Sequence, residues 1–102
     1  MFKSDAEWQE KVASSKEPIL VDFHAQWCGP CKTIAPLVEK LSTEYENVKF
    51  YKVDVEEVPN VAADNGVSAM PTFLFFKNGE NVNQIRGAMP PAVTAAVKEL
   101  AA

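Results

Sequence analysis

Two cysteines, Cys28 and Cys31, are separated by two residues and are the only cysteines among the 102 residues of the chain. A Cys-X-X-Cys sequence occurs in zinc sites and in redox sites, so its position in the chain has to decide between them. Here it follows an apolar, β-rich run and opens a helical pattern, which places Cys28 at the start of a helix. Unpaired backbone N–H groups and the helix dipole favour a thiolate there. The pattern predicts thiol–disulfide chemistry with Cys28 as the nucleophile.

Cys31 lies one helical turn further on, so we expect it to be more buried than Cys28 and close enough to attack a mixed disulfide formed there. This makes Cys31 the resolving thiol. A thiol with a pKa of about 8.5 is only about 3% ionised at pH 7, whereas one with a pKa of about 7 is half ionised, so no metal is needed. Gly29 and Pro30 suit a tight helix entry. A purely structural role for both cysteines is the alternative.

Asp22 interrupts the apolar strand that leads to the cysteines. Burial should raise its pKa and make it a proton acceptor near neutral pH. The single histidine, His24, raises the alternatives of a Cys–His nucleophile or a zinc ligand, but packing is the simpler role. A structural zinc site needs about four ligands, more than two cysteines and one histidine supply. We therefore expect no metal.

The rest of the chain alternates between helical and strand patterns, which predicts an α/β fold. The first helix begins at Ser4 or Asp5, carries Trp8, Val12 and Ala13 on its apolar face, and ends before Pro18. The elements expected after it are strand 19–23, a helix from Cys28 to about Asn47 with a kink at Pro36, strand 48–55, helix 59–64, strand 72–76, an Asn78-Gly79 hairpin, strand 81–86, and a final helix marked by Val93, Val97 and Leu100. They give one domain, residues 1–102, with a mixed sheet flanked by helices on both faces.

Composition limits the possible partners. The chain is 47% hydrophobic and carries a net charge of −4, so it can form a core but offers no basic patch for nucleic acid or anionic membranes. Its first residues lack the basic and apolar segments of a signal peptide, and no later run could span a bilayer. We expect a soluble, cytoplasmic protein.

Three segments together resemble the thioredoxin family. They are Val21-Asp22-Phe23-His24-Ala25-Gln26-Trp27-Cys28-Gly29-Pro30-Cys31-Lys32, then Ala69-Met70-Pro71-Thr72-Phe73, and finally Gly87-Ala88. The resemblance extends over nearly the whole chain. It implies a thioredoxin fold with a central sheet of four to five strands, and a monomer with no bound cofactor that reduces disulfide-containing protein substrates. It also implies a redox-active Cys28–Cys31 disulfide, recharged with electrons from NADPH through thioredoxin reductase.

The same resemblance implies roles for residues near the cysteines. Asp22 would lie beneath Cys31 and help to deprotonate it during resolution. Lys52 would lie near Asp22 and moderate its pKa shift, although a plain solvated strand lysine is the alternative. The Met70–Pro71 bond would be cis, and the backbone of Met70 would pair with an extended substrate segment.

Trp27 directly precedes the nucleophile, so we expect it to form part of an exposed docking surface rather than the core. Gly87 and Ala88 would leave room there for a substrate backbone. Two features depart from the family pattern. The amino terminus offers only Phe2 as a strand residue before the first helix cap, so the usual first strand must be very short or frayed. Arg86 stands before Gly87 where an apolar or small residue is expected, and it could bias docking toward acidic substrates.

Two further functions are compatible with this fold. An oxidase or isomerase would use the same cysteines but would need a less stable disulfide, and Gly29-Pro30 favours the reductant. A binding subunit would use the fold without the thiols.

Overall fold

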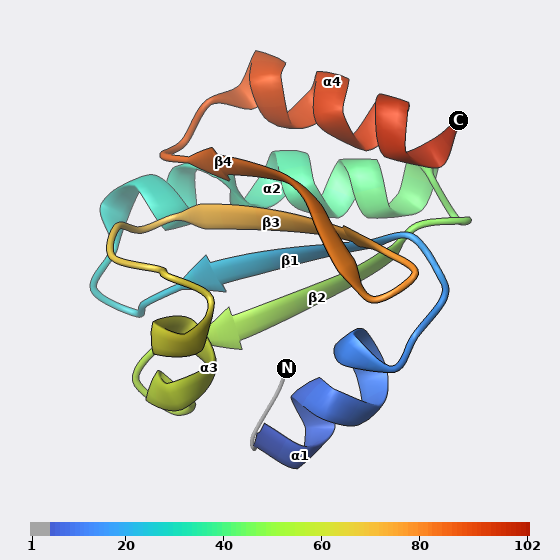
Figure 1. Ribbon diagram of the computed structural model, residues 1–102. Coiled ribbons are helices and arrows are strands. Elements are labelled where there is room, and N and C mark those ends of the chain that lie inside the picture. Colours follow the sequence, from blue (N-terminus) through green and yellow to red (C-terminus); the bar gives the residue numbers. More distant parts are fainter. Residues whose placement is uncertain (1–4) are drawn as a thin grey trace.

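The computed structural model describes residues 5–102 and contains a four-stranded sheet in the order β2-β1-β3-β4 (Figure 1). The strands are β1 (Ile19–His24), β2 (Lys49–Asp54), β3 (Thr72–Lys77) and β4 (Glu80–Arg86). β1 pairs parallel with β2 and antiparallel with β3, and β3 pairs antiparallel with β4. β1, β2 and β4 therefore all run toward the same end of the sheet. The predicted mixed sheet is confirmed, while the short first strand expected at Phe2 lies outside the described residues.

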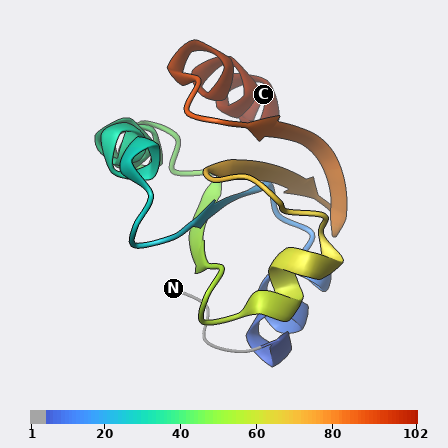
Figure 2. The same ribbon diagram turned by 90° about the vertical axis from the view of Figure 1, so that its left-hand side faces the viewer.

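Helices cover both faces of this sheet, as predicted (Figure 2). The helices α2 (Gly29–Glu44) and α4 (Pro90–Ala101) lie on one face, and α1 (Asp5–Trp8), the π-helix η1 (Gln9–Ala13) and α3 (Pro59–Asp64) lie on the other. Alternate residues of β1 pack into the two cores: Val21 and Phe23 toward α1 and α3, Leu20 toward α2 and α4. β1 is thus the buried central strand that its continuous apolar run predicts.

The first helical segment departs from the prediction at its end. Trp8 and Val12 are buried as expected, and the Trp8 ring lies 5.9 Å from that of Phe23 and 5.5 Å from that of Phe76. Ala13, however, is exposed. The helix widens to a π-helix from Gln9 onward, which moves Ala13 off the face predicted from α-helical spacing.

Helix α2 is continuous from Gly29 to Glu44 and includes Pro36. The kink expected at Pro36 stays a prediction. The helix ends earlier than the predicted Asn47, because Tyr45 leaves helical geometry at φ −112° and ψ 73°.

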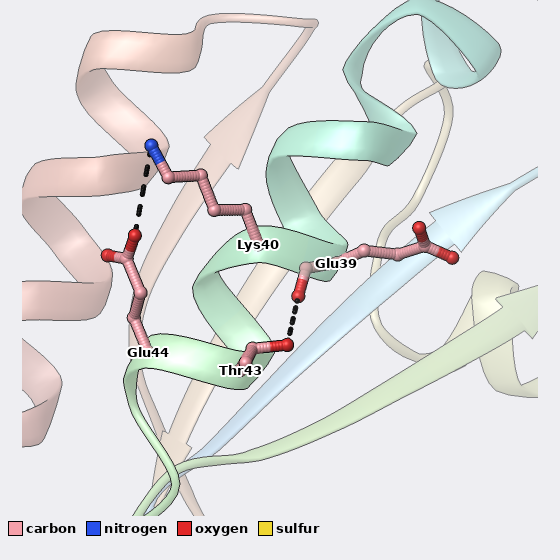
Figure 3. A network of polar contacts seen from close by, with 4 residues as sticks. All are labelled: Glu39, Lys40, Thr43 and Glu44. Carbon is pink, nitrogen blue, oxygen red and sulfur yellow. Dashed lines mark hydrogen bonds and ion pairs between the residues drawn. The ribbon is translucent and has the colours of Figure 1, made fainter.

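The surface of α2 carries short-range polar contacts (Figure 3). Lys40 Nζ lies 3.8 Å from a carboxylate oxygen of Glu44, and Thr43 Oγ1 donates a hydrogen bond of 3.2 Å to the Glu39 carbonyl. Both charged side chains are exposed, so the ion pair contributes at most about 0.5 kcal/mol. The stability of α2 therefore comes from its buried face.

The hairpin between β3 and β4 has the left-handed turn that Asn-Gly predicts. Asn78 and Gly79 have φ values of 56° and 78°. A Cβ atom at Gly79 would lie 2.6 Å from the backbone oxygen of Ala13, so the turn packs closely against the end of η1. A register shift follows, in which Phe75 pairs with Asn83 and Phe76 with Asn81. Val82 is left between them and is exposed.

Candidate active site

The two cysteines lie where β1 gives way to α2, at the end of the sheet toward which β1, β2 and β4 all run. Cys28 is the N-cap residue of α2, with φ −83° and ψ 108°. It forms a disulfide with Cys31, and the two Cα atoms are 5.3 Å apart. The backbone N–H of Cys31 points at Cys28 Sγ, with the nitrogen 3.1 Å away. The predicted position of Cys28 at a helix N-terminus is confirmed.

The expected order of burial of the two cysteines is wrong. Cys28 is 2% exposed and Cys31 is 8% exposed, so the first cysteine is the more covered of the two. Both pack in a small cluster with Ala25, against which Val55 and Met70 also lie. Val55 follows β2 and Met70 precedes β3, so residues distant in sequence pack against the cluster that contains Cys28, which its place at the helix start does not reveal.

The residues around the disulfide leave an open surface beside it. Trp27 is 69% exposed, which agrees with its predicted place outside the core. Gly29 and Pro30 are also exposed, and a Cβ atom at Gly29 would meet nothing within 4 Å. Pro30 stands in the first turn of α2, where its missing N–H leaves no hydrogen bond unmade.

The segment before β3 approaches the cysteines through a cis Met70–Pro71 bond, as the resemblance implies. The carbonyl of Pro71 accepts a hydrogen bond of 2.7 Å from the N–H of Gly87. Gly87 has a φ of 99°, which favours glycine, and a Cβ atom there would meet no atom within 4 Å. Ala88 is half-buried against the core beneath α2 and α4. The structure thus brings Met70, Gly87 and Ala88 to the end of the sheet that carries the disulfide.

Asp22 is buried inside the sheet, with 3% of the residue exposed and no hydrogen-bond partner for Oδ1. Burial raises its pKa from 3.8 to about 6. The positive charge of Lys52 opposes this rise, and Lys52 is the β2 residue in register with Asp22. Both the raised pKa and the moderating lysine agree with the prediction.

An open depression of about 410 Å³ connects this acid to the second cysteine. It is lined by Asp22, His24, Ala25, Gln26, Cys31, Lys32, Ala35 and Lys52. Asp22 and Cys31 therefore share one solvent-facing space. Both residues border this space, although Asp22 Oδ1 forms no hydrogen bond.

His24 also lines this depression, which the sequence reasoning missed. It is half-buried, and its Nε2 atom is buried without a hydrogen-bond partner. Burial lowers its pKa, against the opposing effect of Asp54. The sequence contained the information needed to place His24 beside Asp22, because residues 22 and 24 of one strand face the same side of the sheet.

Among residues 5–102, no group of three His, Cys, Asp or Glu side chains could hold a metal ion.

Known proteins with this arrangement are similar over nearly the full chain. The thioredoxin family model matches residues 1–99. A thioredoxin of Aspergillus fumigatus is 54% identical over 93 residues, which cover 89% of this chain and 84% of the relative. Thioredoxin-1 of Saccharomyces cerevisiae is 50% identical and is matched over 94% of this chain and 92% of its own. The structure of Plasmodium falciparum thioredoxin superposes with a TM-score of 0.91 at 41% identity, over 96% of this chain and 95% of that one.

These matches agree with a disulfide placed between β1 and α2 on a mixed sheet with helices on both faces. No helix within residues 5–102 is both long and apolar enough to cross a bilayer. The chain belongs to the thioredoxin family and is a thiol–disulfide oxidoreductase with Cys28 and Cys31 as its redox-active pair.

Proposed function

We propose that Cys28 is the nucleophile and Cys31 the resolving thiol in the reduction of protein disulfides. The Cys28 thiolate attacks one sulfur of the substrate, a mixed disulfide forms, and the other substrate sulfur leaves as a thiolate. Cys31 then attacks Cys28 Sγ, which closes the Cys28–Cys31 disulfide and releases the second substrate thiol. The substrate gains two electrons and the protein loses two.

The observation that carries this assignment is the N–H of Cys31, aimed at Cys28 Sγ from the first turn of α2. A donor in that position stabilises a thiolate on Cys28, as does the positive end of the helix dipole. The sulfur of Cys31 accepts no such hydrogen bond among the contacts of the described residues, so its thiolate lacks this stabilisation and a nearby proton acceptor is needed to form it. Asp22 supplies one across the depression that both residues line.

The substrate segment would dock on the surface formed by Trp27, Met70, Gly87 and Ala88. Trp27 offers a large exposed ring beside the disulfide. Met70 packs against the cysteine cluster, so a chain that lay along its backbone would bring its own sulfur close to Cys28. Gly87 has no side chain to obstruct that approach.

We further propose that the chain acts as one domain and as a monomer, and that thioredoxin reductase returns electrons to it from NADPH. Relatives of the same family over nearly the same length support this electron route. We propose the cytoplasm as its compartment, because a dithiol reductant needs a reducing environment to be recharged. Two relatives, from Pisum sativum and Spinacia oleracea, are named as chloroplastic, so localisation of a fluorescent fusion would test the compartment directly.

Insulin reduction with NADPH and thioredoxin reductase tests the assignment of the two thiols. The wild type should turn over, Cys28→Ser should not react, and Cys31→Ser should accumulate a mixed disulfide with insulin. Thr43→Ser, an exposed change further along α2, is the matched control and should behave as wild type. A mixed disulfide trapped by Cys28→Ser instead would reverse the two roles, and turnover in a Cys28→Ser, Cys31→Ser double variant would refute them.

A further inference from the structure

Arg86 occupies the last position of β4, close to the segment that touches the cysteines. It pairs with Thr72 across the sheet, and the next residue, Gly87, donates its N–H to Pro71. Met70, which packs on the cysteine cluster, directly precedes Pro71. Arg86 therefore lies at the edge of the surface on which we propose that substrates dock.

The guanidinium of Arg86 is available to a partner. The side chain is exposed, and its recorded contact is a long hydrogen bond of 3.5 Å from Nη2 to the carbonyl of Gly66. Within residues 5–102 no carboxylate forms an ion pair with it. Its neighbour Ile85 packs toward α2 and α4, so Arg86 points to the opposite side, where α3 ends. Most of its five N–H donors remain free for a carboxylate.

The other edge of the same surface carries the opposite charge. β2 and β4 run in the same direction as β1, so the carboxyl ends of all three strands meet at the end of the sheet that holds the disulfide. Glu56 and Glu57 follow β2 and are exposed. The cysteines thus lie between an arginine at the β4 edge and two glutamates at the β2 edge.

We infer that Arg86 selects substrate segments that carry an acidic residue on the side of the reacting cysteine that faces β4. This inference rests on the proposed docking surface. β4 lies two strand spacings from β1, about 10 Å, and an extended peptide advances about 3.4 Å per residue. The acidic residue should therefore stand about three positions from the substrate cysteine. A glutamate on the other side of that cysteine would face Glu56 and Glu57 and be disfavoured.

Peptides with one cysteine, activated as a neutral pyridyl disulfide, test this selection. Reduced protein attacks the peptide sulfur and expels the chromophoric thiopyridone, so the second-order rate constant is read directly. Four peptides carry Glu or Gln about three residues before or after the cysteine. At one of the two placements, we expect the rate constant of the Glu peptide to be about two to five times that of the Gln peptide, which is the range for an exposed ion pair. At the other placement, the Glu peptide should react more slowly than the Gln peptide. The Glu/Gln ratio at the first placement should fall toward one in high salt.

The variants separate this inference from the proposed function. Arg86→Gln should bring the favourable ratio to about one, and Arg86→Lys should keep it above one because the charge remains. Lys77→Gln removes an exposed cation at the far end of β3 and should leave every ratio as in wild type. If wild type reacts with the Gln peptides but shows no Glu preference at either placement, or if Arg86→Gln keeps that preference, the selection by Arg86 is refuted. If wild type reacts with none of the peptides, the proposed function fails.

Discussion

Replacing Asp22 with asparagine should stabilise the protein at neutral pH. The carboxyl group is buried, Oδ1 lacks a hydrogen-bond partner, and burial raises the pKa from 3.8 to about 6. A shift of about two pKa units corresponds to about 3 kcal/mol at 1.36 kcal/mol per unit. Ionised Asp22 thus costs up to about 3 kcal/mol of folding free energy at pH 7. Asparagine has nearly the same shape without the charge, so Asp22→Asn should recover most of that amount.

The gain in the free energy of unfolding that Asp22→Asn brings should depend on pH in a defined direction. The pKa of Asp22 is higher in the folded than in the unfolded chain, so the folded state binds more protons between pH 3.8 and about 6. The wild type therefore loses stability from this group as pH rises through that window, and the loss levels off above it. Asp22→Asn lacks this titration. Its advantage should be nearly absent below pH 3.8 and complete at pH 7.

Urea unfolding of both oxidised proteins near pH 4 and at pH 7 measures this difference, and insulin reduction measures the accompanying loss of rate. Asp54→Asn is the matched control, because Asp54 is also buried but its carboxylate accepts a hydrogen bond of 2.8 Å from the N–H of Glu56. Asp54→Asn should not raise the free energy of unfolding at either pH. Equal or lower stability of Asp22→Asn at pH 7, or an equal gain at both pH values, would refute the burial argument.

Three other substitutions test separate parts of the structure. Lys52→Met removes the charge that opposes the rise in the Asp22 pKa, so that pKa should increase further, which NMR titration of the carboxyl carbon would detect. Gly79→Ala places a Cβ atom 2.6 Å from the Ala13 oxygen at a positive φ and should cost at least about 1–2 kcal/mol in urea unfolding, while activity per folded molecule is retained. Phe73→Ala empties a fully buried position between β3 and the two helices above it and should cost about 3–5 kcal/mol; a loss under about 1 kcal/mol would contradict the packing.

The local sequence was enough to predict the elements whose residue pattern matches their surroundings in the folded chain. The run from Ile19 to Phe23 has apolar residues for both faces, and the sheet covers both. Asn78-Gly79 can adopt two successive left-handed residues without strain, and the turn has them. Cys28 starts a helix because an apolar helical pattern follows it at once. In each case the determining interactions lie within a few residues.

The burial of Cys28 and the exposure of Ala13 were not predictable in this way. Val55, which follows β2, and Met70, which precedes β3, pack against the cluster that contains Cys28, so the burial of Cys28 is a property of the assembled fold. Ala13 follows α-helical spacing in the sequence, but a widened turn places it outside the core, where its carbonyl meets Gly79. Neither outcome follows from the spacing of apolar residues in the sequence.

Asp22 and Lys52 show how two strands set one pKa. Burial alone would raise the pKa of Asp22 further, and a carboxyl group with a pKa far above neutral would stay protonated and could not accept the proton of Cys31 at pH 7. Lys52 limits that rise because the register between β1 and β2 places it opposite Asp22. A shift of this pairing by one residue would remove the lysine from that position. The register of the two parallel strands thus holds the pKa of Asp22 closer to neutral pH, where the proton transfer that we propose with Cys31 would take place.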